Sequence, residues 1–228
     1  MDLTTLYAYQ TPNSSTPKPH PPPRTTMSHT AFFYGTLMAP PVLHRVIWGS
    51  QDPPTPAHAS LLRIRPAILH AHQRHKVKHA DYPAILPTST PSSVRGTLVE
   101  GLTDGDIWRL DVFEGSEYAR RSVSVNVLAD EGKEEGNVED EQVQAETYIW
   151  IAGADRLEAE EWDFSEFVRE KMKRWVGDEG AQADEGFQDV DDAVKALADP
   201  TGGRGANGNI SRQLERGGKE EEVLRSAV

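Results

Sequence analysis

The chain contains no cysteine among its 228 residues. Disulfides, thiolate zinc sites and cysteine nucleophiles are therefore excluded, and the composition suits a reducing compartment, so we expect a cytoplasmic protein. Apolar runs long enough to cross a bilayer are lacking, and the N-terminus has neither the basic start nor the apolar block of a secretory signal. We therefore expect no membrane partner.

Basic residues are scarce, with 24 Lys and Arg against 36 Asp and Glu, and the net charge is −12. The acidity falls in two stretches. Residues 130–141 hold seven acidic residues and one lysine, and residues 178–228 hold twelve acidic and six basic residues. The remainder of the chain is neutral in sum, so the charge belongs to solvated appendages. No basic face offsets phosphate repulsion, and we expect no nucleic-acid partner.

Composition divides the chain into three parts. Residues 1–27 are rich in Pro, Ser and Thr and bury too little apolar surface to offset the entropy of ordering, which predicts a disordered N-terminal extension with Met27 as a candidate start. Residues 28–177 form the predicted domain. Residues 178–228 are typical of a flexible acidic tail, in which residues 189–197 fit a short isolated helix.

Periodicity predicts the elements of the domain. Strands outnumber helices and are mostly separated by short turns, which favours an α+β fold with a mostly antiparallel, barrel-like sheet. The predicted strands are residues 31–33, one or two strands within 61–77, 82–86, 94–99 with a close backbone approach at Gly96, 123–127 and 143–151. One predicted helix starts at Pro40. A second starts after Thr103, which forms a weak capping box with Asp106, and ends near Gly115. A third runs from Glu158 to Trp175.

Glu114 is the first candidate for chemistry. Ile107, Leu110, Asp111 and Glu114 are spaced i, i+3, i+4 and i+7 on one helix, so two carboxylates share a face with two core-type residues. Desolvation favours the neutral acid and raises a carboxyl pKa toward the range that a general base needs. The alternative is a helix-end glutamate in water, with Asp111 accepting structural hydrogen bonds.

A glycine turn follows the first predicted strand. Gly35 has no Cβ and lets the backbone approach a ligand closely. The turn leaves backbone N–H groups free, and the helix start behind it favours an anion such as a substrate carboxylate. The turn lacks the Lys of a P-loop and the further glycines of a dinucleotide loop. An ordinary tight turn is the alternative.

Histidines gather in one short stretch. His70, His72, His75 and His79 lie close in sequence, with Asp81 nearby. On a single strand His70 and His72 share a face, a spacing that some zinc sites use. The alternative is a polar strand end and a basic turn, and no helix supplies further ligands at standard spacing, so we expect no metal. The aromatic residues Trp150, Trp162, Phe164 and Trp175 are interpreted as core or helix-packing residues, with a binding platform as the alternative.

Several segments, in order, resemble the γ-glutamylcyclotransferase-like superfamily, and in particular its plant avirulence-induced branch. Phe33-Tyr34-Gly35-Thr36-Leu37 resembles the substrate loop of the superfamily, and the stretch from Leu110 to Tyr118 resembles its catalytic LD-x-x-E-G…Y segment. Residues 82–85, 94–98 and 161–164 resemble further landmarks. The likeness spans residues 31–175, and the acidic stretch after Leu128 and the long tail depart from the pattern without interrupting it.

The resemblance implies a fold and an activity. The fold is a small mixed, mostly antiparallel β-barrel with flanking helices. The activity is γ-glutamylcyclotransferase: intramolecular acyl transfer that releases 5-oxoproline from a small-molecule γ-glutamyl amine, with no cofactor. Glu114 takes the place of the general acid/base, and Tyr118 of the tyrosine that closes the catalytic segment. Tyr34, Gly35, Thr36 and Leu37 correspond to the substrate loop.

Two other functions stay open at this point. The same pocket would serve a non-catalytic module that binds a γ-glutamyl or 5-oxoproline-like ligand, with the tails recruiting partners. A metal-dependent hydrolase would use the histidine cluster. Glutathione, a γ-glutamyl amino acid and a γ-glutamyl-lysine isopeptide all fit the implied chemistry, and the sequence assigns no oligomeric state.

Overall fold

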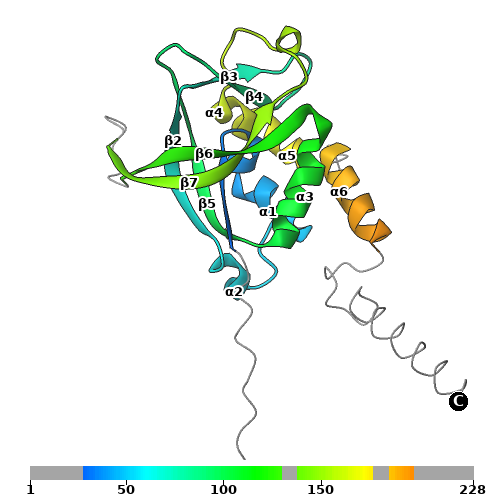
Figure 1. Cartoon of the computed structure of the whole chain (residues 1–228). Coiled ribbons are helices and arrows are strands. Elements are labelled where there is room, and N and C mark those ends of the chain that lie inside the picture. The colour runs from blue at the N-terminus through cyan, green and yellow to red at the C-terminus, as the bar shows by residue number, and fades with distance from the viewer. Residues whose placement is uncertain (1–27, 130–137, 177–184, 198–228) are drawn as a thin grey trace, which may run out of the picture.

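A closed barrel of five strands forms the centre of the molecule (Figure 1). The computed structural model describes residues 28–129, 138–176 and 185–197. Around the barrel the order is β1 (His29–Phe33), β5 (Ser93–Leu102), β2 (Arg63–His70), β6 (Tyr118–Leu128) and β7 (Glu139–Trp150). Neighbours pair antiparallel except β1 and β7, whose parallel pairing closes the barrel. The predicted mixed, mostly antiparallel barrel is confirmed.

Helices and a small second sheet surround the barrel. Strands β3 (His72–Lys76) and β4 (Pro83–Pro87) pair as a separate two-stranded sheet. Helices α1 (Pro40–Trp48), α3 (Asp104–Glu114) and α6 (Glu185–Ala196) gather on one side of the barrel in Figure 1, and they contact one another. The shorter helical segments are α2 (Pro56–Ala59), α4 (Phe164–Glu166), a π-helical turn (Phe167–Lys171) and α5 (Met172–Trp175).

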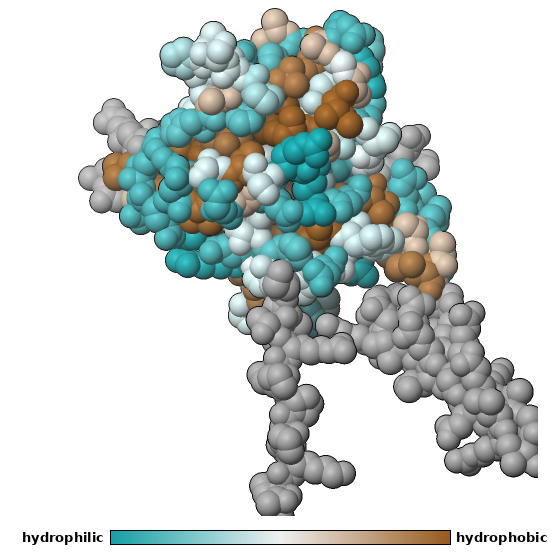
Figure 2. Space-filling model, viewed as in Figure 1, coloured by the Kyte–Doolittle hydropathy of each residue, from teal (hydrophilic) through white to brown (hydrophobic). Residues whose placement is uncertain are grey.

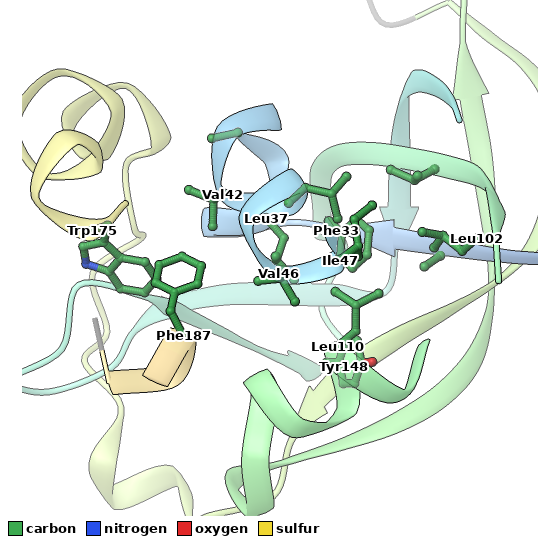
Figure 3. Packing of buried hydrophobic residues seen from close by; sticks show 14 of the residues in the cluster. Phe33, Leu37, Val42, Val46, Ile47, Leu102, Leu110, Tyr148, Trp175 and Phe187 are labelled. Carbon is green, nitrogen blue, oxygen red and sulfur yellow. The ribbon is translucent and has the colours of Figure 1, made fainter. Parts of the chain in front are cut away.

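Strand β1 is buried on both faces because it lies between the barrel interior and the helices. Successive side chains of a strand point to opposite faces. Phe32 and Tyr34 accordingly belong to the cluster inside the barrel, whereas Ala31 and Phe33 belong to the cluster shared with α1 and α3. Figure 3 shows Phe33 beside Ile47 of α1 in this second cluster. The turn that leaves β1 is therefore anchored from both sides.

Helix α3 begins and ends as the sequence predicts. Thr103 accepts a hydrogen bond from the Asp106 backbone N–H at 3.2 Å, and the Asp106 carboxylate accepts one from the Thr103 N–H at 2.9 Å, which completes the capping box. Gly115 ends the helix with a positive φ of 65°, which glycine adopts without strain. These two ends fix Glu114 as the last residue of the helix.

The predicted C-terminal boundary at residue 177 is wrong. Helix α6 lies beyond it and packs on the domain: the Phe187 side chain has no exposed surface, and it lies beside Trp175 (Figure 3). The Arg45 guanidinium of α1 donates two hydrogen bonds to the Asp191 carboxylate, at 2.9 and 2.7 Å. Burial of the apolar stripe of α6 outweighs the acidic composition of the segment. Residues 178–184 and 198–228 of the predicted tail, and the extension 1–27, lie outside the described residues.

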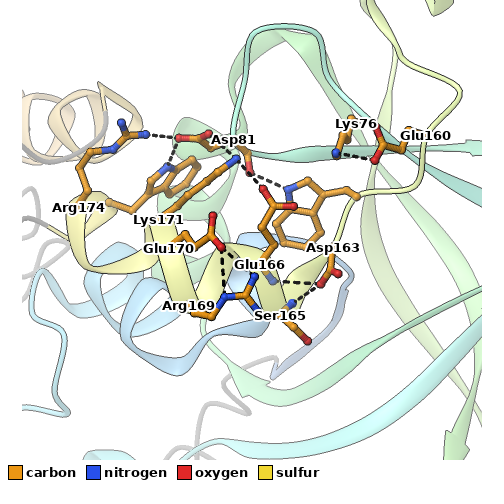
Figure 4. Close-up of polar contacts among 12 residues, drawn as sticks. Lys76, Asp81, Glu160, Asp163, Ser165, Glu166, Arg169, Glu170, Lys171 and Arg174 are labelled. Atoms are coloured by element: carbon orange, nitrogen blue, oxygen red, sulfur yellow. Dashed lines mark hydrogen bonds and ion pairs between the residues drawn. The ribbon is translucent and has the colours of Figure 1, made fainter.

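The predicted helix from Glu158 to Trp175 starts later than expected. Residues 157–160 lie beside β3, because the Lys76 N–H donates to the Glu160 carbonyl and the Glu158 N–H to the Lys76 carbonyl. The Asp163 carboxylate then accepts hydrogen bonds from the N–H groups of Ser165 and Glu166 and caps the helix (Figure 4). A helix starting at Glu158 would forfeit the hydrogen bonds to β3.

The predicted pairing of histidines on one strand face is also wrong. His70 ends β2 and His72 begins β3, with Ala71 between them at φ of 56°. The His70 ring pairs with the Glu139 carboxylate at 2.9 Å. Glu139 is the first residue of β7, so the last three residues of the acidic stretch belong to a strand, while residues 130–137 lie outside the described part of the chain.

On the face drawn in Figure 2, hydrophilic side chains surround smaller hydrophobic patches. Within the described ranges, no helix has the length and apolar character needed to span a bilayer.

Candidate active site

A cavity of about 440 Å³ opens where β1 leaves the barrel. Its wall brings together residues that are distant in sequence, and all six site residues predicted from the sequence contribute to it: Tyr34, Gly35, Thr36, Leu37, Glu114 and Tyr118. The other lining residues come from several elements and, in chain order, are Phe32, Phe33, Tyr82, Pro83, Phe113, Gly115, Glu117, Tyr148, Trp175, Gly186 and Asp189.

Glu114 presents an unusual carboxylate to this cavity. Its side chain is half-buried among aromatic residues. Burial, which disfavours the charged form, and the nearby negative charge of Asp111 together raise the pKa of Glu114 to about 8. Among the described residues, the Glu114 carboxylate accepts no hydrogen bond and forms no ion pair. It is therefore free to exchange a proton with a bound molecule.

Asp111 has the structural role that the sequence left as an alternative. One turn before Glu114, its carboxylate pairs with the Arg120 guanidinium at 2.8 Å and accepts a hydrogen bond from the Tyr148 hydroxyl at 2.9 Å. Its side chain is exposed and it does not line the cavity. Asp111 thus holds Tyr148 in the cavity wall and contributes negative charge near Glu114.

The turn after β1 presents unpaired backbone donors. Its carbonyl groups are used, because Met38 and Ala39 donate their N–H groups to the carbonyls of Gly35 and Thr36, at 3.0 and 3.1 Å, in the short 3-10 helix Thr36–Met38. The N–H groups of Gly35, Thr36 and Leu37 donate to no group in the described ranges. Three consecutive donors therefore remain available at the cavity wall, as the first N–H groups of any helical turn must.

Gly35 is required for a reason that the sequence did not reveal. A Cβ on Gly35 would stand 2.7 Å from Cγ of Pro83, the first residue of β4. That separation is shorter than carbon atoms tolerate without a shift. The glycine therefore allows the turn to lie directly against β4, so that Gly35 and Pro83 line the cavity side by side. The predicted need for close approach holds toward Pro83, and approach to a ligand remains a prediction.

Two tyrosines brace the cavity with hydroxyl groups that are already engaged. The Tyr34 hydroxyl donates to the Tyr148 carbonyl at 2.6 Å, and the Tyr118 hydroxyl donates to the Pro83 carbonyl at 2.9 Å. Burial raises the pKa of both hydroxyls well above the ordinary value, with the charge of Glu114 adding to the effect. Both tyrosines therefore stay neutral and act as structural hydrogen-bond donors.

Sequence reasoning overlooked several parts of the wall. Glu117, which follows the end of α3, lines the cavity, where it pairs with Arg156 and accepts a hydrogen bond from the Tyr82 hydroxyl at 3.3 Å. Tyr148 and Asp189 arrive from β7 and α6 and carried no local motif. Tyr82 and Pro83 did carry a signal, because they belong to a segment that resembles the superfamily.

The charged groups of the cavity wall all have the same sign. Glu114, Glu117 and Asp189 are acidic, and no Lys, Arg or His in the described ranges lines the cavity. An anionic part of a ligand would therefore have to bind backbone N–H groups, whereas a cationic part would find carboxylates. No group of three or more His, Cys, Asp or Glu residues within residues 28–129, 138–176 and 185–197 is placed to hold a metal ion.

Comparison with known proteins identifies the family. The model of the gamma-glutamyl cyclotransferase, AIG2-like family matches residues 31–164, more than half of the chain, and the chain belongs to this family. Protein AIG2 C of Arabidopsis thaliana is 32% identical over 140 residues, which cover 61% of this chain and 72% of the relative. AIG2-like protein D of the same plant is 32% identical over 152 residues, or 67% and 87% of the two chains.

Solved structures give similar matches. The solution structure of an Arabidopsis thaliana protein is 28% identical, covers 65% of this chain and 86% of its own, and has a TM-score of 0.42. The crystal structure of an AIG2-like protein from Mus musculus is 21% identical, covers 61% and 90%, and has a TM-score of 0.40.

Proposed function

We propose that this protein is a γ-glutamylcyclotransferase that releases 5-oxoproline from a γ-glutamyl amine, with Glu114 as its general acid/base. The observation that carries the proposal is the Glu114 carboxylate, which faces the cavity without a partner among the described residues and has its pKa raised to about 8. Membership in a family named for this activity supports the choice of reaction.

The cavity suits the two charges of a γ-glutamyl group. The N–H groups of Gly35, Thr36 and Leu37 donate to no described residue and offer hydrogen bonds to the α-carboxylate or to the oxygen of the γ-carbonyl. Because no basic side chain of the described ranges lines the cavity, these N–H groups are the natural place for negative charge. The α-amine, cationic when it arrives, is attracted to the acidic wall.

Proton transfer follows from the pKa values. The substrate α-amine must lose a proton before its lone pair can attack the γ-carbonyl carbon, and α-amino groups have a pKa of about 7.7–8.0 in model peptides. The pKa of Glu114 is raised to about 8. Donor and acceptor are therefore matched, which is the condition that favours general acid–base catalysis.

The bonds change in two stages. The α-nitrogen bonds to the γ-carbon, the former carbonyl oxygen becomes negative, and Glu114 holds the released proton. The bond from the γ-carbon to the leaving nitrogen then breaks as Glu114 returns its proton to that nitrogen. The released amine takes up the second proton of the ring nitrogen, so 5-oxoproline and an ammonium ion result. Since nucleophile and electrophile belong to one molecule, the main task of the cavity is to hold the folded-back conformer. The aromatic wall, which includes Phe113, Tyr118 and Trp175, can confine that conformer.

The experiment compares two glutamate-to-glutamine variants. Glutathione, a γ-glutamyl amino acid and a γ-glutamyl-lysine isopeptide are incubated with the protein and 5-oxoproline is measured. Glu114→Gln keeps size and polarity but accepts no proton, and we expect kcat to fall by about 100- to 10,000-fold. The matched control is Glu170→Gln, which removes an exposed carboxylate paired with Arg169 away from the cavity and should retain wild-type kcat.

Glu117→Gln would not serve as the control, because Glu117 lines the cavity. Wild-type turnover by Glu114→Gln would show that another group moves the proton. Absence of 5-oxoproline from every substrate, together with measurable binding of 5-oxoproline, would favour a binding module instead.

A further inference from the structure

We propose that Arg74 is a positioning residue for the proposed reaction: it holds the Tyr34 carbonyl outside the cavity and thereby directs the Gly35 N–H into it. The inference rests on the proposed function for its role in turnover. The orientation of the N–H group can be tested by ligand binding alone. Arg74 does not line the cavity and carries no part of the sequence motif.

Arg74 is fixed by contacts on several sides. One guanidinium nitrogen, Nη1, donates to the Tyr34 carbonyl at 2.9 Å and lies 3.5 Å from the Arg95 carbonyl. The other, Nη2, donates to the Glu161 carboxylate at 2.8 Å. The guanidinium carbon lies 5.8 Å from the centre of the Trp162 ring, within the range of a cation–π contact. These contacts leave the guanidinium little freedom to rotate.

The direction of the Gly35 N–H follows from the geometry of the peptide unit. The Tyr34 carbonyl and the Gly35 N–H belong to one planar peptide group, and in a trans peptide these two bonds point in opposite directions. The described part of the chain contains no cis peptide bond. The carbonyl points at Arg74, which does not line the cavity, and the N–H therefore points away from Arg74; we infer that it points toward the wall that Gly35 contributes.

The segment after β7 secures Arg74 from outside. Residues 157–160 run beside β3 through a bridge between Val77 and Leu157 and through backbone hydrogen bonds between Lys76 and both Glu158 and Glu160. This pairing places Glu161 and Trp162 over the guanidinium. Two residues along β3, the Lys76 ammonium pairs with the Glu160 carboxylate at 3.0 Å (Figure 4). Arg74 and Lys76 therefore tie the same two segments, but only Arg74 reaches the turn.

The Nε–H group of Arg74 indicates that Arg74 does more than stabilise the fold. That atom is buried and donates to no group in the described ranges. A buried donor without a partner costs free energy, so a residue that only tied β3 to its neighbours would do so at lower cost through a partly exposed ion pair, as Lys76 does. The carbonyl of Tyr34 is what Arg74 reaches and Lys76 does not.

The test uses Arg74→Gln and Arg74→Lys, with Lys76→Gln as matched control for a tie between the same segments. We expect kcat/KM and the affinity for 5-oxoproline to fall by about 10- to 100-fold in Arg74→Gln, because one donor loses its orientation. Arg74→Lys keeps the charge and one donor and should recover part of the loss. Lys76→Gln should match the wild type in both quantities.

A direct readout comes from NMR. Tyr34–Gly35 is the only Tyr-Gly pair in the sequence, so labelling tyrosine carbonyls with carbon-13 and glycine amides with nitrogen-15 selects the Gly35 amide. That signal should shift when 5-oxoproline is added to wild type or Lys76→Gln, and shift less in Arg74→Gln. If Arg74→Gln does not fold, Arg74→Lys and the wild-type titration still decide.

The outcomes separate this inference from the proposed function. A Gly35 amide that does not respond to bound 5-oxoproline would overturn the inference, as would equal kcat/KM in Arg74→Gln and Lys76→Gln. A wild type that binds 5-oxoproline and shifts the Gly35 amide without any turnover would overturn the proposed function and support the orientation by Arg74. A wild type with neither turnover nor binding would overturn both.

Discussion

Two walls of different construction enclose the cavity. The wall next to the barrel, called the barrel wall here, is formed by the turn after β1 (Tyr34, Gly35, Thr36 and Leu37) and by Glu114 at the end of α3, and it lies within residues 31–164, the range matched by the family model. The helix wall, formed by Gly186 and Asp189 of α6, lies beyond that range. The proposed proton transfer and the proposed hydrogen bonds to the substrate oxygens use the barrel wall alone. The helix wall closes the site and is supplied by a segment whose composition suggested a disordered tail.

The walls also differ in how they are held. The barrel wall is anchored on both faces of β1, within two hydrophobic clusters. The helix wall is held chiefly by the buried Phe187, whose ring lies 5.2 Å from Phe113 and 5.4 Å below the Arg45 guanidinium, and by the pair between Arg45 and Asp191. We therefore expect the helix wall to respond to single substitutions that leave the barrel folded.

The largest expected effect is the loss of the helix wall. Phe187→Ala removes a fully buried ring, and comparable substitutions cost about 3–5 kcal/mol. Thermal unfolding followed by circular dichroism should show a lower Tm than for the control Gln188→Ala, an exposed neighbour on α6. Truncation after residue 177 should have the same effect, whereas removal of residues 1–27 should leave Tm unchanged. Equal Tm values for Phe187→Ala and Gln188→Ala would mean that α6 does not pack on the domain in solution.

A smaller effect is expected at the turn of the barrel wall. Gly35→Val places atoms against the Pro83 ring, and overpacking of this kind costs about 1–3 kcal/mol. Because the turn must move away from β4, calorimetry should show weaker binding of 5-oxoproline as well as a lower Tm. Gly105→Ala is the matched control, since a Cβ there has only ordinary contacts. Wild-type affinity in Gly35→Val would separate the turn from the ligand site.

The raised pKa of Glu114 predicts how stability depends on pH. Its pKa is about 8 in the folded chain and near 4.3 when unfolded, so between these values the folded state binds more protons and wild-type stability falls as pH rises. Glu114→Gln lacks this loss. The variant should therefore unfold at a higher temperature than the wild type at pH 9, with the difference shrinking toward pH 4. A difference that does not change with pH would contradict the raised pKa.

How much the sequence predicts depends on the range of the interactions. The capping box of Thr103 and the place of Glu114 on the buried side of α3 depend on residues a few places apart, and both could be predicted. Helix α6 had a signal, because Phe187, Val190 and Val194 recur at helical spacing, but the acidic composition obscured it. Arg74 contacts Tyr34, which lies 40 positions away, and is itself held by Glu161 and Trp162. No local pattern encodes this contact.

The smallest expected effect concerns the exposed carboxylate of the helix wall. Asp189 lies at the rim of the cavity and forms no ion pair with the described residues, so its charge acts through solvent on the departing amine. Three substrates share one γ-glutamyl group and carry a leaving amine with a cationic, a neutral or an anionic end: γ-glutamyl-putrescine, γ-glutamyl-pentylamine and γ-glutamyl-4-aminobutyrate. In Asp189→Asn, kcat/KM for γ-glutamyl-putrescine divided by kcat/KM for γ-glutamyl-4-aminobutyrate should be about two- to fourfold lower than in the wild type, as one screened charge allows. The neutral substrate should be unaffected, and the effect should vanish at high salt. Equal changes for all three substrates would mean that Asp189 shapes the wall without acting through its charge.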